Sequence, residues 1–420
     1  MVLAKLTAMP HAPTSRPRTL AYVGGDILLP DGVLDDTAIL IDDGVIVAIG
    51  EPIPPRTREV RLDRQLILPG IVDLHGDAVE RALCPRPGVH LPLAMALREN
   101  DAALIANGIT TSYCSITDSF EPGLRGRGVV RAFVEALTGP ERIGLACQTL
   151  VHLRHEVCLT EGHDELVEWL ATGRIHLLST ADHLPDADDH VKLGRFLSGI
   201  RRRISASDAE IDRIIAAALA ARPLGREQCA ELASIAVGLG IPLASHDDES
   251  MASVDAGVAR GVRICEFPAS LPVACYARAR GQAVLLGAPN YVRGGSHVGW
   301  MGVAEALAGD ALDCLCSDYH YPSVFHAPFR MAAIGARSLA AAWALVSDAP
   351  ARAAGLDGRK GRIAPGYDAD LLVVDASAEV PRLAAVVAGG VEVARFAPVT
   401  ARTSTRAEAR PSAASAHSVS

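Results

Sequence analysis

The chain has 420 residues, of which 49% are hydrophobic and 21% are charged. This length is enough for two or three domains, or for one large barrel with an accessory domain. The formal net charge is −9, and the only basic tract is Arg201–Arg203, so the composition gives no support to nucleic-acid binding. No apolar run is long enough for a membrane span or a signal peptide, so we expect neither insertion nor secretion.

Residues 1–18 combine prolines and basic residues without an apolar pattern, and we expect a disordered lead-in. Short apolar runs separated by turns follow from Leu20 to Ala48, and Asp42-Asp43-Gly44 between two of them is a hairpin signal. This part of the chain therefore predicts a small β unit.

A second β-like region lies near the other end of the chain. It begins with GRIAPGYDADLLVVD at 361–375 and continues through Ala384–Val393. We expect residues 19–65 and 360–399 to pair as one composite β domain. Residues 400–420 are rich in Ser, Ala, Arg and Thr and lack apolar periodicity, which indicates a disordered tail.

Between these regions, residues 66–359 alternate apolar runs with Ala-rich helical segments. The candidate strands are 66–75, 109–117, 143–153, 175–182, 241–246, 263–267, 283–288 and 313–317. Eight strands with intervening helices predict an α/β fold, a (β/α)8 TIM barrel beside the composite β domain. A doubly wound sheet is the alternative, but no glycine-rich phosphate fingerprint follows the first strand.

Histidines and carboxylates recur where these runs end. Alternation along a strand puts His75 and Asp77 on the same side. The other polar groups at strand ends are His152, Arg154, Glu156, Asp182, His183, His246, Asp247, Asp248, Glu266, Asp318 and His320. Each of these residues, taken alone, could instead cap a turn or a helix, or be a buried residue whose polar atoms are hydrogen-bonded. Since unpaired buried polar groups are costly, so many at one barrel end favour a functional site.

Neutral imidazoles with carboxylates suit zinc, and also manganese or iron, and disfavour a soft thiolate site. We therefore expect one or two divalent cations, with Asp318 orienting a water molecule and accepting its proton. The nine cysteines are odd in number, scattered and without a Cys-x-x-Cys pair. They predict free thiols in a reducing cytoplasm rather than a disulfide framework.

Four segments resemble the amidohydrolase superfamily. They are LPGIVDLHGD, SHDDES, CSDYH and the closing GRIAPGYDADLLVVD. The resemblance implies a (β/α)8 barrel with one or two divalent metals and a β-sandwich built from both chain ends.

A narrower resemblance is to the α-D-ribose 1-methylphosphonate 5-triphosphate diphosphatases of the carbon–phosphorus lyase pathway. The segments that carry it are LHGDAVERALCPRPGV, NGITT, LRHEV, ADH, ASHDD, EFP, GAPNYVRGGSH and CSDY. It implies hydrolysis of a phosphorylated sugar, a ribosyl 5-triphosphate, to the 5-phosphate and pyrophosphate. A homo-oligomer is compatible with this resemblance.

The resemblance also implies a set of metal ligands, which are His75, Asp77, Glu156, His183, His246 and Asp318. The usual His-x-His of the superfamily is His75-Gly76-Asp77 here, as in this subgroup. No lysine ends a strand at the bridging position, and Glu156 is its natural replacement. Strand six offers Glu266 where other members have a histidine, so either the strand count is shifted or the second metal site differs.

Binding of substrate phosphates requires hydrogen-bond donors, and three segments of the sequence contain them. Glycine N–H groups and a guanidinium fork occur together in the segment 290–297. Arg86 lies in a proline-rich turn, and Arg154 shares a strand face with Glu156. The predicted substrate-binding residues are Arg86, Arg154, Asn290, Arg293, Gly294, Gly295, Ser296 and His297. A surface loop, a fixed turn and a structural salt bridge are the respective alternatives.

Two other functions stay open. The same metals polarise a carbonyl as readily as a phosphoryl group, so an amidohydrolase acting on an N-acyl or cyclic amide is the alternative. A non-enzymatic barrel that serves as an assembly partner is a further one. It is disfavoured because His75, His246 and Asp318 are all present.

Overall fold

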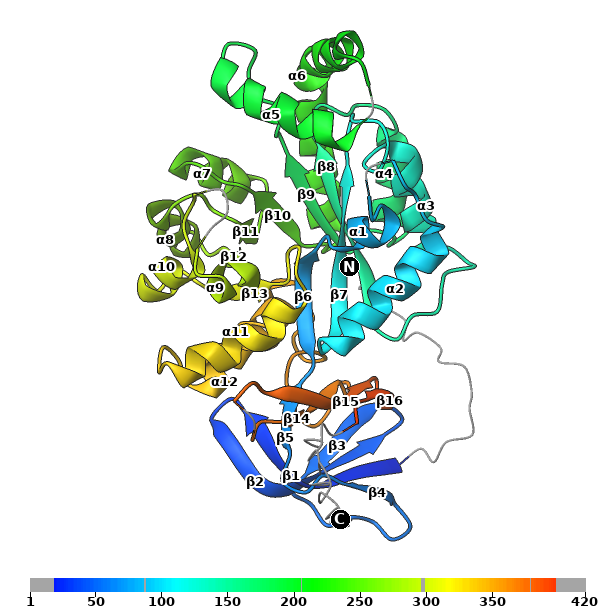
Figure 1. The fold of residues 1–420 in the computed structure, drawn as a ribbon, viewed down its shortest axis with the longest axis vertical. Coiled ribbons are helices and arrows are strands. Elements are labelled where there is room, and N and C mark those ends of the chain that lie inside the picture. The colour runs from blue at the N-terminus through cyan, green and yellow to red at the C-terminus, as the bar shows by residue number, and fades with distance from the viewer. Residues whose placement is uncertain (1–18, 87, 205, 296–298, 378, 398–420) are drawn as a thin grey trace, which may run out of the picture.

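The computed structural model describes residues 19–86, 88–204, 206–295, 299–377 and 379–397. The predicted disordered ends, 1–18 and 400–420, lie outside the described residues. Figure 1 shows two parts, a barrel with its surrounding helices and a β domain packed against one end of it. No helix among the described residues is long and apolar enough to cross a membrane.

Eight parallel strands form the barrel in chain order, which confirms the predicted (β/α)8 TIM barrel. Strand β13 returns to β6 through a bridge between Gly76 and Asp318. Asp318 N–H donates to His75 O (2.8 Å) and Asp77 N–H donates to Asp318 O (3.1 Å). The strands are β6 (Ile71–Gly76), β7 (Ile109–Asp118), β8 (Gln148–Glu156), β9 (Leu177–Ala181), β10 (Leu243–His246), β11 (Ile264–Glu266), β12 (Ala283–Gly287) and β13 (Cys314–Cys316).

Helices surround the barrel and bury their apolar faces against its strands (Figure 1). The helices are α1 (Val79–Leu83), α2 (Leu93–Ala106), α3 (Arg127–Thr138), α4 (His163–Ala171), α5 (His190–Arg203), α6 (Asp208–Gly238), α7 (Met251–Ala259), α8 (Leu271–Ala279), α9 (Ala288–Val292), α10 (Val303–Ala308), α11 (Pro322–Ala333), α12 (Leu339–Ala344) and α13 (Asp348–Ala353). Helix α6 continues without a break through Pro223. Gly225 lies where a Cβ would be 1.7 Å from Val157 O, so the helix packs tightly there.

The β domain is a single sheet in the order β16-β15-β14-β5-β1-β2-β3, with β4 paired to β1. The two ends of the chain meet where β5 runs antiparallel to β14. Its strands are β1 (Thr19–Leu29), β2 (Gly32–Asp42), β3 (Val45–Ile49), β4 (Arg58–Arg61), β5 (Leu66–Pro69), β14 (Leu371–Asp375), β15 (Arg382–Ala388) and β16 (Val391–Arg395).

The predicted strand 66–75 is wrong as a single barrel strand. Leu66–Pro69 belongs to the sheet of the β domain, and only Ile71–Gly76 enters the barrel. The chain passes from one sheet to the other at Gly70, where a Cβ would lie 2.2 Å from Thr110 Oγ1. Both sheets bury apolar residues at this crossing, so the apolar run did not reveal the change of sheet.

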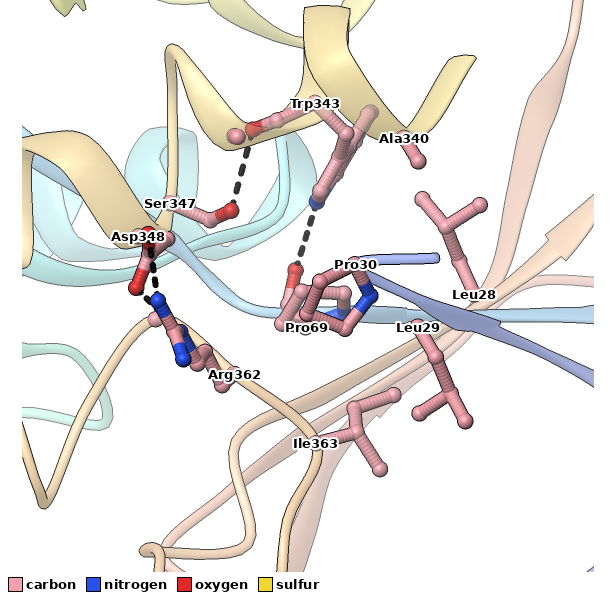
Figure 2. A pocket seen from close by; sticks show the side chains of 12 residues that line it. Leu28, Leu29, Pro30, Pro69, Ala340, Trp343, Ser347, Asp348, Arg362 and Ile363 are labelled. Carbon is pink, nitrogen blue, oxygen red and sulfur yellow. Dashed lines mark hydrogen bonds and ion pairs between the residues drawn. The ribbon is translucent and has the colours of Figure 1, made fainter. Parts of the chain in front are cut away.

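Trp343 on α12 joins the two parts of the molecule. Its Nε1–H donates to Pro69 O at 3.0 Å, as Figure 2 shows. Beside this contact lies a cavity of about 50 Å³, lined by Leu28, Pro30, Trp343 and Ile363 among others. Since ligand sites usually measure about 300–1,000 Å³, we interpret this space as a gap in packing between the domains.

The barrel closure depends on Asp73, which is fully buried on β6. Its carboxylate accepts hydrogen bonds from Ser317 N–H (2.9 Å) and Ser317 Oγ–H (2.5 Å). In Asp73→Ala both donors stay buried without a partner, and we expect the free energy of unfolding to fall by about 3 kcal/mol. Urea denaturation measures this loss, with Ser317→Ala as a milder comparison. A loss below about 1 kcal/mol would contradict the role given to Asp73.

His176 precedes β9 and gives the fold a dependence on pH. Its Nδ1 accepts Val151 N–H at 3.1 Å, and burial lowers its pKa from 6.5 to about 4. Because the unfolded chain binds this proton more tightly, the stabilisation is complete above pH 6.5 and is lost as the pH falls toward 4. The loss is at most about 3 kcal/mol. In His176→Asn, which keeps an acceptor that does not titrate, we expect a flatter dependence of unfolding free energy on pH. An unchanged slope would be against this assignment.

Candidate metal centre

Three buried side chains meet at the carboxyl ends of β6, β10 and β11. Glu266 Oε2 lies 3.2 Å from His75 Nδ1 and 3.2 Å from His246 Nδ1. The two imidazoles stack with their centroids 5.5 Å apart. His75, His246 and Glu266 form one candidate metal-binding group, because one possible ligand atom from each lies within 4.8 Å of the others. We call it the inner group.

The electrostatics of the inner group fit a divalent cation. Burial lowers the pKa of His75 to about 3 and lowers that of His246 well below its ordinary value, so both rings are neutral. Burial also raises the pKa of Glu266. Glu266 Oε1 is buried and has no hydrogen-bond partner among the described residues. Neutral imidazoles beside a carboxylate oxygen that accepts no hydrogen bond from a described residue are a donor set that zinc, manganese or iron would complete.

A second candidate group consists of His183, His246 and Asp247, and we call it the outer group. Asp247 Oδ2 lies 3.8 Å from His183 Nε2 and 3.7 Å from His246 Nε2. His246 therefore belongs to both groups, through ring nitrogens that face opposite ways. Burial raises the pKa of Asp247 to about 6.

Glu156, at the end of β8, orients His183. Its carboxylate pairs with His183 Nδ1 and also lies 3.4 Å from His183 N. Although burial lowers the pKa of His183, the charge of Glu156 more than offsets this and raises it. A carboxylate that binds the second nitrogen of an imidazole fixes the ring for a metal. Glu156, predicted as a ligand, contacts a candidate ligand in this structure.

Arg154 is the buried cation of the centre. Its guanidinium donates to His246 Nε2 at 2.7 Å and lies 3.9 Å from Asp77 Oδ2. Since a guanidinium only donates, Nε2 accepts, and Nδ1 of His246 carries the proton that faces Glu266. The lone pair of Nε2 is available either to Arg154 or to a cation, but not to both.

The chain turns sharply after three of the strands that carry these residues. Asp247, Phe267 and Asp318 all have positive φ angles, of 60°, 54° and 52°. Left-handed backbone is rare for a bulky residue and occurs preferentially at functional sites. The Phe267 ring packs edge-on against His75 (5.0 Å) and His246 (5.3 Å), so this turn holds both imidazoles in place.

Asp318 follows β13 and lies beside β6 through its backbone hydrogen bonds to His75 and Asp77. Burial, with a further contribution from the charge of Asp77, raises the pKa of Asp318 to about 7. Its Oδ2 approaches Gly287 so closely that a Cβ there would lie 2.9 Å away. Asp318 thus faces the barrel mouth between β12 and β6.

The structure brings the predicted residues His75, His183 and His246 together. Asp77 and Asp318 belong to neither candidate group among the described residues. The predicted set of metal ligands does not include Glu266 and Asp247, although both are among the polar residues at strand ends in the sequence. The signal for Glu266 was its place on strand six, where a histidine was expected instead.

The predicted phosphate loop has a different structure. Asn290 lies in the short helix α9, Gly294 N–H donates to Tyr291 O (3.2 Å) and Gly295 N–H donates to Asn290 O (2.8 Å). These N–H groups are occupied by the end of the helix rather than directed to a ligand. Arg293 is exposed. Ser296 and His297 lie outside the described residues.

Comparisons with known proteins agree with this architecture. A model of the amidohydrolase family matches residues 318–400. The α-D-ribose 1-methylphosphonate 5-triphosphate diphosphatase of Escherichia coli (strain K12) is 32% identical over 314 residues, which cover 73% of this chain and 82% of that protein.

Solved structures share the fold at low identity. A prolidase complexed with N-methylphosphonate-L-proline is 16% identical, with a TM-score of 0.61 over 90% of this chain and 100% of that one. L-hydantoinase (dihydropyrimidinase) from Arthrobacter aurescens is 14% identical, with a TM-score of 0.61 over 91% of this chain and 97% of that one.

Proposed function

We propose that this chain, which belongs to the amidohydrolase superfamily, hydrolyses α-D-ribose 1-methylphosphonate 5-triphosphate to the 5-phosphate and pyrophosphate. The observation that carries the proposal is the buried guanidinium of Arg154 among the metal-binding candidates, 2.7 Å from His246. A fixed cation suits an anionic substrate better than a neutral amide. The enzyme would then act in phosphonate catabolism, in the cytoplasm.

An ion in the inner group would be held by His75, His246 and Glu266, and an ion in the outer group by His183, His246 and Asp247. Because a neutral imidazole has one lone pair, His246 would serve both ions at once only as an imidazolate. A bound divalent cation supplies a Lewis acid that lowers the pKa of water and offsets phosphate charge. Zinc is the first expectation from this donor set, and manganese or iron also fit.

Side chains of the protein accept the proton and bind the phosphoryl group. Water attacks the α-phosphorus, which an anhydride oxygen joins to the β-phosphate, and Asp318 accepts the proton that the water loses. The bond from phosphorus to the bridging oxygen breaks, and pyrophosphate leaves with the electron pair. Arg154 donates to the phosphoryl oxygens and holds them in place as charge develops.

An amidohydrolase that acts on an N-acyl or cyclic amide is the second candidate. One observation favours it, since the N–H groups of Gly294 and Gly295 bond within the chain and offer no phosphate cradle. The same ligands would serve attack at a carbonyl carbon.

Incubation of the purified, metal-loaded enzyme with the ribosyl triphosphate distinguishes the two. We expect pyrophosphate and the 5-phosphate in equal amounts, and no turnover of N-acyl or cyclic amides. Metal content is measured on the same sample. Absence of pyrophosphate from enzyme that contains metal would refute the proposal, and turnover of an amide would favour the alternative.

A further inference from the structure

A second charged feature lies on the same side of the barrel as the candidate metal centre. It is a cavity of about 210 Å³ formed by α1 and the turn after it, the loop between β7 and α3, and the last turn of α5. Figure 1 shows α5 beyond the ends of β8 and β9. The charged residues that line the cavity are Glu80, Arg86, Glu121, Arg125, Arg202 and Arg203. We call it the arginine cavity.

Two of its four arginines are fixed by carboxylates. Arg125 forms two hydrogen bonds to Glu80 (3.0 and 3.1 Å), and Arg203 forms two to Glu121 (2.8 and 2.7 Å). Each guanidinium uses only part of its donors in such a pair. The carboxylates therefore hold these two side chains in position and leave N–H groups for a ligand.

The other two arginines supply excess charge. The side chains of Arg86 and Arg202 make no ion pair or hydrogen bond to any residue that the structure describes, and both are exposed. Four arginines against two glutamates leave a formal excess of two positive charges. In a chain whose net charge is −9, this is a local reversal of sign.

The arginine cavity adjoins the candidate metal centre through Asp77. Glu80 N–H donates to Asp77 O (3.0 Å), and Arg154 approaches the Asp77 carboxylate at 3.9 Å. On the other side, α5 connects the two places. Lys192 near its start pairs with Glu249 (2.9 Å), two residues after Asp247, and Arg203 ends the helix at the cavity.

We propose that the arginine cavity binds a phosphorus oxyanion of the substrate, either the departing pyrophosphate end or the methylphosphonate on the ribose. Paired and unpaired guanidinium groups together suit a tetrahedral phosphorus oxyanion, which accepts two-point hydrogen bonds. The cavity is smaller than the usual 300–1,000 Å³ or so of a whole ligand site, so it takes one end of a ligand. The choice of these two groups rests on the proposed function, whereas anion binding does not.

The test removes the two unpaired arginines together, in Arg86→Ala/Arg202→Ala. Neither removal leaves a carboxylate without its partner, so the fold should be retained, and thermal unfolding checks this. The control is Arg201→Ala, which removes one positive charge from α5, as Arg202→Ala alone does, but takes its arginine from an ion pair with Asp208 outside the cavity.

Calorimetric titration of the metal-loaded enzyme with inorganic pyrophosphate, and separately with methylphosphonate, gives the affinities. We expect the double variant to bind one of these anions at least about tenfold more weakly, while the control stays within about twofold of the parent. The anion that is affected identifies the end of the substrate. Equal affinities in the double variant and the parent for both anions, or no binding of either anion to the parent, would overturn the inference.

Turnover separates this inference from the proposed function. If the ribosyl triphosphate is hydrolysed, we expect the double variant to raise KM at least about tenfold with little change in kcat. Hydrolysis with an unchanged KM would overturn the cavity assignment and leave the proposed function standing. Anion binding that depends on the two arginines, without hydrolysis of the ribosyl triphosphate, would support the cavity assignment and overturn the proposed function.

Discussion

Asp318→Asn is expected to lower kcat of the proposed hydrolysis by about 10²–10⁴-fold. The amide keeps the shape of the side chain but cannot take a proton from water. Asparagine also tolerates the left-handed backbone of this position, where φ is 52°, so the turn after β13 should be retained. Steady-state kinetics on the ribosyl triphosphate measure the effect.

The control for this substitution is Asp43→Asn in the β domain. It makes the same change at another aspartate with positive φ, in an exposed turn far along the chain from β13. Metal content must be measured beside kcat, because Asp318 was predicted both as a ligand and as the proton acceptor. A variant that keeps its metal and more than a tenth of the parent kcat would contradict the role of proton acceptor.

The architecture could be predicted because parallel strands that are buried on both faces have continuous apolar sequences. Each of the eight apolar runs overlaps one barrel strand, although β6, β7 and β8 extend beyond the predicted ends. The run at 66–75 misled in one respect, since Leu66–Pro69 is equally apolar but serves the other sheet. Hydrophobicity indicates that a segment is buried, but it does not indicate which of two adjoining cores buries it.

The metal centre could be predicted only in part, and Asp77 shows why. Alternation places residues i and i+2 on one side only while the strand continues, and β6 ends at Gly76. Asp77 N–H instead bonds to Asp318 O at 3.1 Å, which turns this residue toward the barrel closure and Arg154. Glu266 was named among the polar strand ends, but its closeness to His75 is a contact across 191 positions that no local pattern contains.

The structure of the predicted phosphate loop differs from the expected one at two glycines, for a related reason. The sequence predicts that glycine N–H groups in 290–297 bind phosphate, whereas the N–H groups of Gly294 and Gly295 donate to backbone oxygens of the short helix α9. A glycine after a helix and a glycine beside a phosphate look alike in sequence. The arginine cavity shows the converse, because it joins three segments that are remote along the chain and share no motif.

His246→Ala is expected to abolish activity and to weaken metal binding by more than about a hundredfold. His246 is the only residue shared by the inner and outer groups among the described residues, so its loss removes a ligand from both. His75→Ala and His183→Ala each remove a ligand from a single group. Elemental analysis after dialysis, with His176→Asn as a histidine control outside both groups, gives the metal content of each variant.

The comparison among these variants decides how many ions the centre holds. With two ions, His75→Ala and His183→Ala should each retain one equivalent while His246→Ala retains neither. With one ion in the inner group, His183→Ala should keep the full parent content and His75→Ala should lose it. Full metal content in His246→Ala would refute both arrangements. The ion would then lie elsewhere at the barrel mouth, and Asp77 and Asp318, which the structure leaves outside both groups, would be the carboxylates to test next.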